Sequence, residues 1–262
     1  MTAPIHTRIW REEAEPDNPF AARTAWCRGY DVFGEMLGRA RWVEMLWLLF
    51  RSERPTPAAA DLLETLALAL ANPGPRDASV HAAMCGGIGG ATAAAALMAA
   101  LAAGAGRCGG AREVHDAMAA WRECGEDIAA WAAFPARHRD DEIDVWPAME
   151  HVPGFDPRGV STPTPVKQLL AHLAAAGTPR LAWLQAQRPA MEAAVGLPLA
   201  TTGVAAAALA DLGFAPEEGE MLFLLLRLPG AAAHALEQRG HHYRDFPFPE
   251  VELTDDPARR TP

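Results

Sequence analysis

The chain has 262 residues, a formal net charge of −10 and a hydrophobic content of 50%. This acidic balance, with no long basic run to reverse it, argues against nucleic acid as a partner. The four cysteines, at positions 27, 85, 108 and 124, form no Cys-x-x-Cys pair and have no metal-ligand spacing with a histidine, so we expect no metal.

Residues 1–18 are polar and mixed in charge, which is unlike a signal peptide. The most hydrophobic stretch, residues 86–105, is about long enough to span a bilayer, but it is mostly alanine and glycine, which contribute little transfer free energy. We therefore expect no membrane association and interpret this stretch as a buried helix. A cytoplasmic location with reduced cysteines follows as an expectation.

Apolar side chains recur at helical spacing along most of the chain, and no stretch alternates as a strand would. Two prolines within residues 53–57 end the first predicted helix, because proline lacks a donor and fixes the backbone. The predicted helices cover residues 42–50, 62–70, 91–101, 114–131, 166–173, 205–212 and 218–238. The fold class is therefore predicted to be all-α.

Small residues at Gly86, Gly87, Gly89 and Gly90, and the alanines after them, allow another helix to approach closely. We infer from this a helix at the centre of a homodimer interface.

Gly, Pro and charged residues gather between residues 136 and 164, so we expect the longest non-helical connection there, as a mobile active-site loop. Its acidic residues, 140–144, are interpreted as a solvated face rather than a metal site. The proline-rich, acidic tail from residue 246 cannot be helical throughout and is expected to lie over the surface or a dimer mate.

Four short runs share an order and spacing typical of one enzyme family. The runs are residues 72–81, which begin Asn-Pro-Gly-Pro and end in His; residues 106–111, Gly-Arg-Cys-Gly-Gly-Ala; residues 153–158, Pro-Gly-Phe-Asp-Pro-Arg; and residues 227–238, Arg-Leu-Pro-Gly-Ala-Ala-Ala-His-Ala-Leu-Glu-Gln. They resemble the citrate synthase superfamily, and most closely its citryl-CoA lyase branch, including the C-terminal module of ATP-citrate lyase.

The resemblance implies a helical homodimer in which each chain has a large and a smaller domain. The small domain would cover residues 108–204, and the large domain residues 1–107 and 205–262, the latter with an irregular tail. It also implies a reaction that cleaves or forms a carbon–carbon bond beside a CoA thioester, with a di- or tricarboxylic acid as the other component. Coenzyme A would enter as a thioester substrate, and no metal is expected.

Most of the family's catalytic residues are replaced in this alignment. Pro73 stands for a substrate-binding histidine, Cys108 for a histidine that the lyase branch already lacks, and Pro157 for the catalytic histidine. Leu199, four residues before Gly203, stands for the catalytic aspartate. We therefore predict a divergent active site.

The remaining candidates for catalysis are His81, Asp156 and Cys108. Asp156 lies beside the lost histidine and would act as a base if burial raised its pKa. The alternative for His81 is a hydrogen-bonded histidine at a helix start, and the alternative for Cys108 is an inert buried thiol.

Arg158, Arg227, Arg244 and His234 are the candidates for substrate binding. In the family such arginines bind substrate carboxylates or CoA, and a planar guanidinium can donate two parallel hydrogen bonds to a carboxylate. The alternative for Arg227 is a salt bridge that only stabilises a helix.

Two classes of function stay open. The first is a divergent CoA-dependent lyase or synthase. The second is a non-catalytic protein of the same fold that binds an acyl-CoA or a polycarboxylate, or that pairs with an active paralogue as a regulatory subunit.

Overall fold

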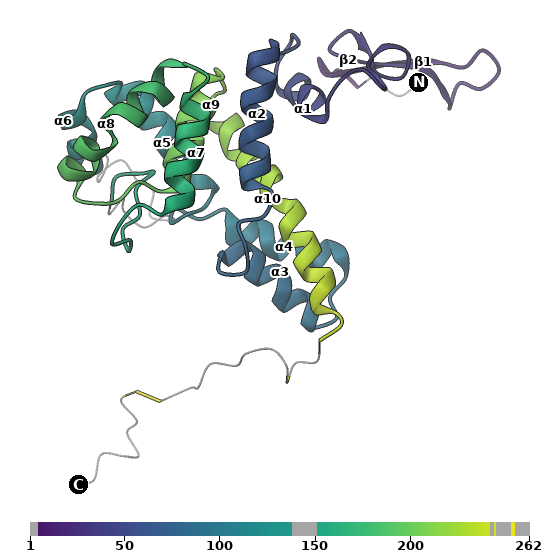
Figure 1. The fold of residues 1–262 in the computed structure, drawn as a ribbon. Coiled ribbons are helices and arrows are strands. Elements are labelled where there is room, and N and C mark those ends of the chain that lie inside the picture. The colour runs from purple at the N-terminus through teal and green to yellow at the C-terminus, as the bar shows by residue number, and fades with distance from the viewer. Residues whose placement is uncertain (1–4, 138–150, 242–243, 245–252, 255–262) are drawn as a thin grey trace. The chain divides into compact units, whose positions relative to one another are not determined.

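The computed structural model describes residues 5–137, 151–241, 244 and 253–254. Helices dominate these residues, as predicted (Figure 1). The chain divides into two compact units: the first holds residues 1–71 and 105–226, and the second residues 72–104 and 227–262. Residues 138–150 of the predicted loop, including the acidic residues 140–144, and most of the tail lie outside the described residues. The domain boundaries predicted from the resemblance, at residues 108 and 204, stay a prediction.

The first unit begins with a small sheet and continues as helices. Its elements are β1 (Trp10–Ala14), β2 (Ala22–Cys27), β3 (Tyr30–Asp31), the π-helical turn η1 (Val32–Met36), α1 (Trp42–Phe50), α2 (Pro57–Leu70), α5 (Ala111–Cys124), α6 (Ile128–Arg137), α7 (Thr164–Ala174), α8 (Pro179–Val195) and α9 (Thr201–Asp211). The helix α10 (Pro216–Gln238) starts in this unit and ends in the second.

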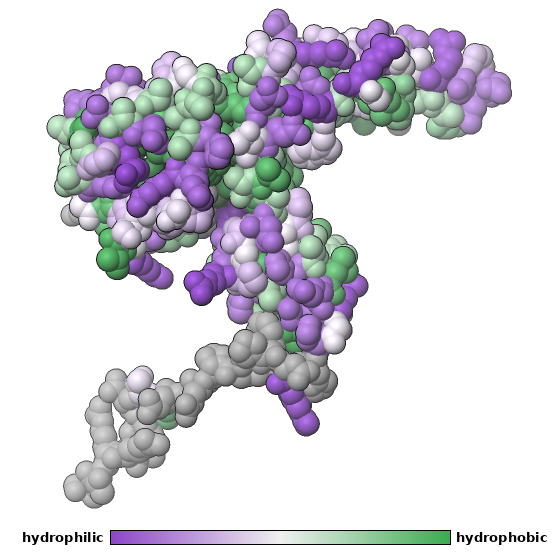
Figure 2. Space-filling view, in the orientation of Figure 1, coloured by the Kyte–Doolittle hydropathy of each residue, from purple (hydrophilic) through white to green (hydrophobic). Residues whose placement is uncertain are grey.

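The three strands contradict the prediction that no stretch alternates as a strand would. They form an antiparallel sheet in the order β1-β2-β3, with Trp10 opposite Cys27 in its first pair. Ala25 and Cys27 are buried while Trp26 between them is partly exposed. Only one end of β2 shows this period of two, so the alternation was too short to detect in the sequence. Hydrophilic residues cover much of the sheet (Figure 2).

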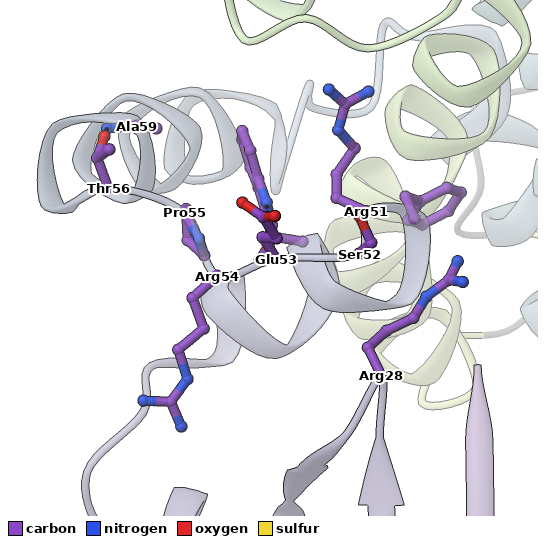
Figure 3. A pocket seen from close by; sticks show the side chains of 10 residues that line it. Arg28, Arg51, Ser52, Glu53, Arg54, Pro55, Thr56 and Ala59 are labelled. Carbon is purple, nitrogen blue, oxygen red and sulfur yellow. Dashed lines mark hydrogen bonds between the residues drawn. The ribbon is translucent and has the colours of Figure 1, made fainter. Parts of the chain in front are cut away.

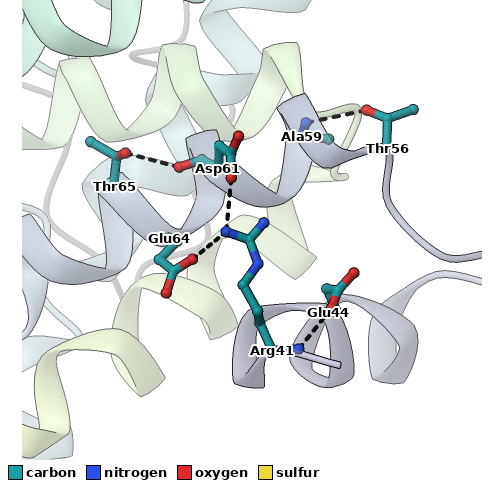
Figure 4. A network of polar contacts seen from close by, with 7 residues as sticks. All are labelled: Arg41, Glu44, Thr56, Ala59, Asp61, Glu64 and Thr65. Carbon is teal, nitrogen blue, oxygen red and sulfur yellow. Dashed lines mark hydrogen bonds and ion pairs between the residues drawn. The ribbon is translucent and has the colours of Figure 1, made fainter. Parts of the chain in front are cut away.

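A charged network connects α1 to α2. The backbone N–H of Arg41 donates to Glu44, which caps α1, while the Arg41 guanidinium lies 2.8 Å from Asp61 and 2.5 Å from Glu64 on α2 (Figure 4). These side chains are exposed, so solvent screens the ion pairs and they contribute little to stability. The network therefore orients the two helices, and the apolar packing of residues such as Leu63 stabilises them.

Helix α9 is the centre of the first unit. Residues 202–209 are all buried, and α9 packs against α2, α5, α7 and α8 (Figure 1). Five of these eight positions are glycine or alanine, so neighbouring backbones can approach closely. This centre matters for function because the segment that leads into α9 contains Leu199.

One predicted helix is two helices in the structure. The prediction of residues 114–131 is wrong at Gly125, whose φ of +53° ends α5 before α6 begins. The side chain of Asp127 caps the new helix by accepting from the backbone of Ala129 and Ala130. Because apolar residues keep their helical spacing across Gly125, the sequence pattern did not reveal the end of α5. Residues 179–195 form α8, which was not among the predicted helices.

The second unit consists of α3 (Ala78–Ile88), α4 (Ala93–Gly104) and the last part of α10. The interpretation of residues 86–105 as one buried helix is therefore wrong: Gly90, with φ of +71°, separates two helices, and most of α4 is not buried. A methyl group at Gly87 would overlap the backbone of Ala235, so glycine here lets α10 contact α3.

Candidate active site

A buried carboxylate at the start of α5 binds two separate turns. Glu113 is 2% exposed, and it accepts hydrogen bonds from the backbone N–H of Gly109 at 2.5 Å and of Gly154 at 3.0 Å. Gly109 directly follows Cys108, and Gly154 lies two residues before Asp156. One side chain thus holds both turns that carry predicted catalytic residues of the first unit.

The turn at Gly154 is also joined to the segment before α9. The backbone N–H of Asp156 donates to Pro198 at 2.8 Å, and that of Ala200 donates to Gly154 at 2.9 Å. A β-carbon at Gly154, where φ is +89°, would lie 2.7 Å from the α-carbon of Gly203. The structure therefore requires glycine here, and it places residues 154–156 beside Leu199.

Asp156 caps its own turn. Its Oδ1 accepts from the backbone N–H of Arg158 at 2.9 Å, which leaves acceptor capacity on the carboxylate. Pro157 and Arg158 are exposed, and the Arg158 side chain makes no hydrogen bond or ion pair with any residue that the structure describes. Leu199 differs: its side chain is 1% exposed and belongs to the apolar core.

A buried hydroxyl and a carboxylate fix the segment around Leu199. The backbone N–H of Leu199 donates to the Thr162 hydroxyl at 2.9 Å, and that hydroxyl donates to Glu192 at 2.5 Å. Arg188, one turn earlier on α8, lies 2.7 Å from Glu192. Burial alone would raise the pKa of Glu192, but the hydrogen bonds from Thr162 and Arg188 and the charge of Arg188 lower it below its usual value.

A second charged cluster lies on α5 beside Glu113. Asp116 is 7% exposed, and three basic side chains surround its carboxylate: His115 at 2.9 Å, Arg112 at 3.2 Å and Arg107 at 3.6 Å. Since Arg107 precedes Cys108, the cluster anchors the glycine-rich turn from its other end. Cys108 itself is exposed, so the interpretation of it as a buried thiol is wrong, and its thiol makes no hydrogen bond or ion pair among the described residues.

His151 is a candidate that the sequence analysis missed. Its side chain is 12% exposed, and Nε2 lies 3.6 Å from Glu113 Oε1. That nitrogen is buried and has no hydrogen-bond partner among the residues described. A buried, unpaired imidazole nitrogen is unusual in a structural histidine. The available signal was its position, directly before the run at 153–158.

In the second unit, Arg227 pairs with Asp77. Arg227 is 5% exposed, and its guanidinium donates to the Asp77 carboxylate. Burial lowers the pKa of Arg227, and the charge of Asp77 acts in the opposite direction. Asp77 is also the N-cap of α3, because it accepts from the backbone N–H of Ser79 at 2.9 Å. Asp77 was not among the predicted site residues.

The other predicted residues of this unit are less constrained. His81 is exposed, and its backbone N–H bonds to the carbonyl of Asp77, so it lies one helical turn after the Asp77–Arg227 pair. His234 lies 3.4 Å from Glu237 on the same face of α10. Arg244 is exposed, close to the end of the described part of the unit.

The predicted residues thus form two groups. In the first unit, the turns carrying Cys108, Asp156 and Arg158 are held together through Glu113. In the second unit, His81 and Arg227 are joined through Asp77, and His234 pairs with Glu237 on α10.

Among the described residues, no group of three or more His, Cys, Asp or Glu side chains could hold a metal ion. Within the same part of the chain, no helix is long and apolar enough to cross a membrane.

No protein-family model matches the sequence, and no curated protein matches it in sequence. Solved structures do match. Citryl-CoA lyase from Hydrogenobacter thermophilus is 20% identical with a TM-score of 0.73, and the match covers 98% of this chain and 97% of that one. ATP citrate lyase from Methanothrix soehngenii, in complex with citrate and coenzyme A, is 20% identical with a TM-score of 0.67, over 96% of this chain and 42% of that one.

Citrate synthase from the archaeon Thermoplasma acidophilum, in complex with carboxymethyl coenzyme A and oxaloacetate, is 19% identical with a TM-score of 0.51. That match covers 83% of this chain and 59% of the other. The chain therefore has a citrate synthase-like fold, and the solved structures that share it include citryl-CoA lyase and ATP citrate lyase. At these identities the similarity establishes the fold alone.

Proposed function

We propose that this protein binds a CoA thioester and a di- or tricarboxylic acid and cleaves or forms the carbon–carbon bond between them, as a citryl-CoA lyase-like enzyme with a divergent active site. The observation that carries the proposal is the match to a citryl-CoA lyase over nearly the full length of both chains. The shared attachment of two turns to Glu113 supports it, because these turns lie where the resemblance puts active-site runs. A cytoplasmic location and a homodimer belong to the same proposal.

The reaction needs one base and a binding site for carboxylates. In the synthetic direction the base removes a proton from the α-carbon of the thioester, and the enolate carbon attacks the keto carbon of the acid, which becomes an alkoxide and takes up a proton. In the cleavage direction the base takes the hydroxyl proton, the carbon–carbon bond breaks, and the enolate is protonated.

Two side chains of the first unit fit the base. Asp156 keeps free acceptor capacity on a partly buried carboxylate. His151 has an unpaired ring nitrogen near Glu113, which would stabilise the imidazolium after proton transfer. Cys108 fits less well, because its thiol is exposed and makes no hydrogen bond or ion pair among the described residues.

Arg158 and Arg227 differ as binders of a carboxylate. Arg158 is exposed, and its side chain makes no hydrogen bond or ion pair with a described residue. Its guanidinium can therefore donate two parallel hydrogen bonds to a ligand. Arg227 already donates to Asp77, so a substrate carboxylate would have to share the guanidinium with an anionic neighbour. We therefore rank Arg158 above Arg227, with Arg244 and His234 as further candidates.

The second candidate function is a non-catalytic binding or regulatory protein of this fold, alone or with an active paralogue. Leu199 favours it, because the side chain at the position aligned with the family's catalytic aspartate is buried in the core. Pro157, at the aligned histidine, has no group that can transfer a proton. Binding without turnover is the property that separates this candidate from the enzyme.

Binding is tested by thermal unfolding of the full chain with citrate, acetyl-CoA or both. A ligand at a hundred times its Kd should stabilise the fold by about 2.7 kcal/mol and raise the Tm. Arg158→Ala should weaken citrate stabilisation about tenfold in affinity or more, and Arg227→Lys less. Exposed Arg122→Ala, which removes the same charge from α5, is the control. No stabilisation by any acyl-CoA or polycarboxylate would rule out both candidate functions.

Turnover is tested by following oxaloacetate release from citryl-CoA, and the consumption of oxaloacetate in the presence of acetyl-CoA in the reverse direction. We expect activity far below that of a complete site, because loss of one general base removes a factor of about 10² to 10⁴. Asp156→Asn or His151→Gln should abolish the remainder, whereas Cys108→Ala should not. Ligand stabilisation without turnover would support the non-catalytic protein, and robust turnover would show that the alignment of Pro157 or Leu199 is wrong.

A further inference from the structure

A cavity of about 540 Å³ lies in the first unit, apart from the candidate active site (Figure 3). It is lined by residues between 28 and 59, from the turn after β2, the end of α1 and the start of α2. Its volume falls within the roughly 300 to 1,000 Å³ of small-molecule sites. None of the predicted catalytic or substrate-binding residues lines it.

The lining is positively charged in a chain that is negative as a whole. Arg28, Arg51 and Arg54 line the cavity together with one acidic residue, Glu53, so two positive charges are in excess there while the chain carries −10. In Figure 3, Arg51 and Arg54 extend in different directions from the segment that follows α1, and Arg28 comes from the turn after β2. The start of α2 adds the partial positive charge of a helix N-terminus, although Thr56 Oγ1 already accepts from the backbone N–H of Ala59.

Two of these arginines are fixed by the fold. The Arg28 guanidinium donates to the backbone carbonyls of Leu48 and Leu49, each at 3.3 Å, so it closes the end of α1. A carbonyl carries no net charge, so the charge of Arg28 is not neutralised by these bonds. Arg51 donates to the carbonyl of Gly213 at 2.8 Å, and Glu218 lies 3.6 Å away. The positive charge of Arg51 is thus partly neutralised by Glu218.

Arg54 is held in place but has unused donors. Its guanidinium lies over the Tyr30 ring, 4.7 Å from the ring centre, and it has no hydrogen bond or ion pair among the residues that the structure describes. Stacking restricts the side chain and leaves its N–H groups, at the guanidinium edge, available to a ligand. Ser52 is exposed on the same lining and offers a hydroxyl.

We propose that this cavity binds a phosphate-bearing anion with at least two negative charges. Arg54 and Ser52 would contact the phosphate oxygens. The positive charges of Arg28 and Arg51, which the fold holds in place, would attract the anion electrostatically. Arginine suits phosphate because it donates two parallel hydrogen bonds. Glu53 opposes such a ligand, so it limits binding of singly charged anions. The shared chemistry is a diphosphate, either free or as part of a nucleotide.

The test is calorimetric titration of the full chain with inorganic pyrophosphate at constant ionic strength. We expect saturable binding of one pyrophosphate per chain, weakened about tenfold by Arg54→Ala, the size of one charge-assisted hydrogen bond. Exposed Arg39→Ala, outside the cavity, removes the same charge and should change nothing. Glu53→Gln should tighten binding. Absent binding, or equal losses in Arg54→Ala and Arg39→Ala, would overturn the proposal.

Two further titrations identify the ligand and the site. ADP binding more tightly than pyrophosphate in the wild type, with both weakened by Arg54→Ala, would assign the site to a nucleotide; equal affinities would assign it to the free diphosphate. Citrate binding that depends on Arg54, without pyrophosphate binding, would contradict a phosphate site. Pyrophosphate binding that Arg158→Ala removes and Arg54→Ala does not would place the ligand at the proposed active site instead, and so also contradict it.

Discussion

Both compact units bury a charged side chain beside their predicted site residues, but the charges are stabilised differently. In the first unit, the carboxylate of Glu113 accepts from backbone N–H groups of two turns. In the second, the guanidinium of Arg227 is paired with the carboxylate of Asp77. A buried charge must be hydrogen-bonded or paired, and both arrangements satisfy that requirement.

The difference has a consequence for function. Bonds to backbone N–H groups fix the path of the chain, so Glu113 determines where Cys108 and Asp156 lie. Two side chains of opposite charge neutralise each other. Arg227 therefore has less positive charge and fewer free hydrogen-bond donors for a ligand than its place in the sequence motif implies. An arginine at the expected position of a motif therefore does not by itself identify a binding residue.

The largest expected effect is that of Glu113→Ala. It removes the acceptor of the buried Gly154 N–H and of the Gly109 N–H, and we expect a loss of about 3 kcal/mol in the free energy of unfolding. Urea unfolding followed by tryptophan fluorescence measures this. Glu113→Gln, which keeps one carbonyl acceptor, should lose about half as much. Equal stability of Glu113→Ala and the wild type would mean that Glu113 does not hold the two turns.

A smaller effect is expected for the Arg227–Asp77 pair. Arg227→Ala should reduce the free energy of unfolding by about 2 kcal/mol, because it leaves the α3 cap carboxylate without its cation. Combining Arg227→Ala with Asp77→Asn should cost less than the sum of the single changes, by about 1 kcal/mol, since Asn still caps α3 and removes the unpaired charge. Additive losses in this double-mutant cycle would contradict a direct pair.

The smallest effect concerns Glu192 and pH. The lowered pKa of Glu192 in the folded state means that its charged form stabilises the fold above the unfolded-state pKa, about 4.3, and that this contribution disappears as pH falls through the folded-state pKa. Glu192→Gln should therefore be less stable than the wild type by about 1 kcal/mol at pH 7, and the gap should close below about pH 4.

Chemical unfolding of both proteins between pH 7 and pH 3 measures this gap. Arg122→Gln, which changes an exposed charge on α5, controls for the general effect of net charge. A gap that is the same at both ends of the range would show that the ionised Glu192 contributes nothing through Thr162 and Arg188.

The sequence predicted much of the helical fold and part of the site. The helices over residues 42–50, 166–173, 205–212 and 218–238 correspond to α1, α7, α9 and α10, because their apolar periods are long enough to identify. The runs at 106–111 and 153–158 were singled out, and the structure holds both against α5. Asp77, Glu113 and His151 were missed, since a charged residue looks the same in sequence whether it is buried or solvated.

What the sequence determined by itself was the helical class, through the period of its apolar residues, and the location of the glycine-rich turns. The tertiary structure decided which charges are buried and what they contact. Gly125 and Gly90 became helix breaks because of a positive φ that their neighbours do not encode. Arg227 became half of an ion pair, and Arg54 kept its donors free, because hydrogen-bond partners distant in sequence are selected only when the helices pack.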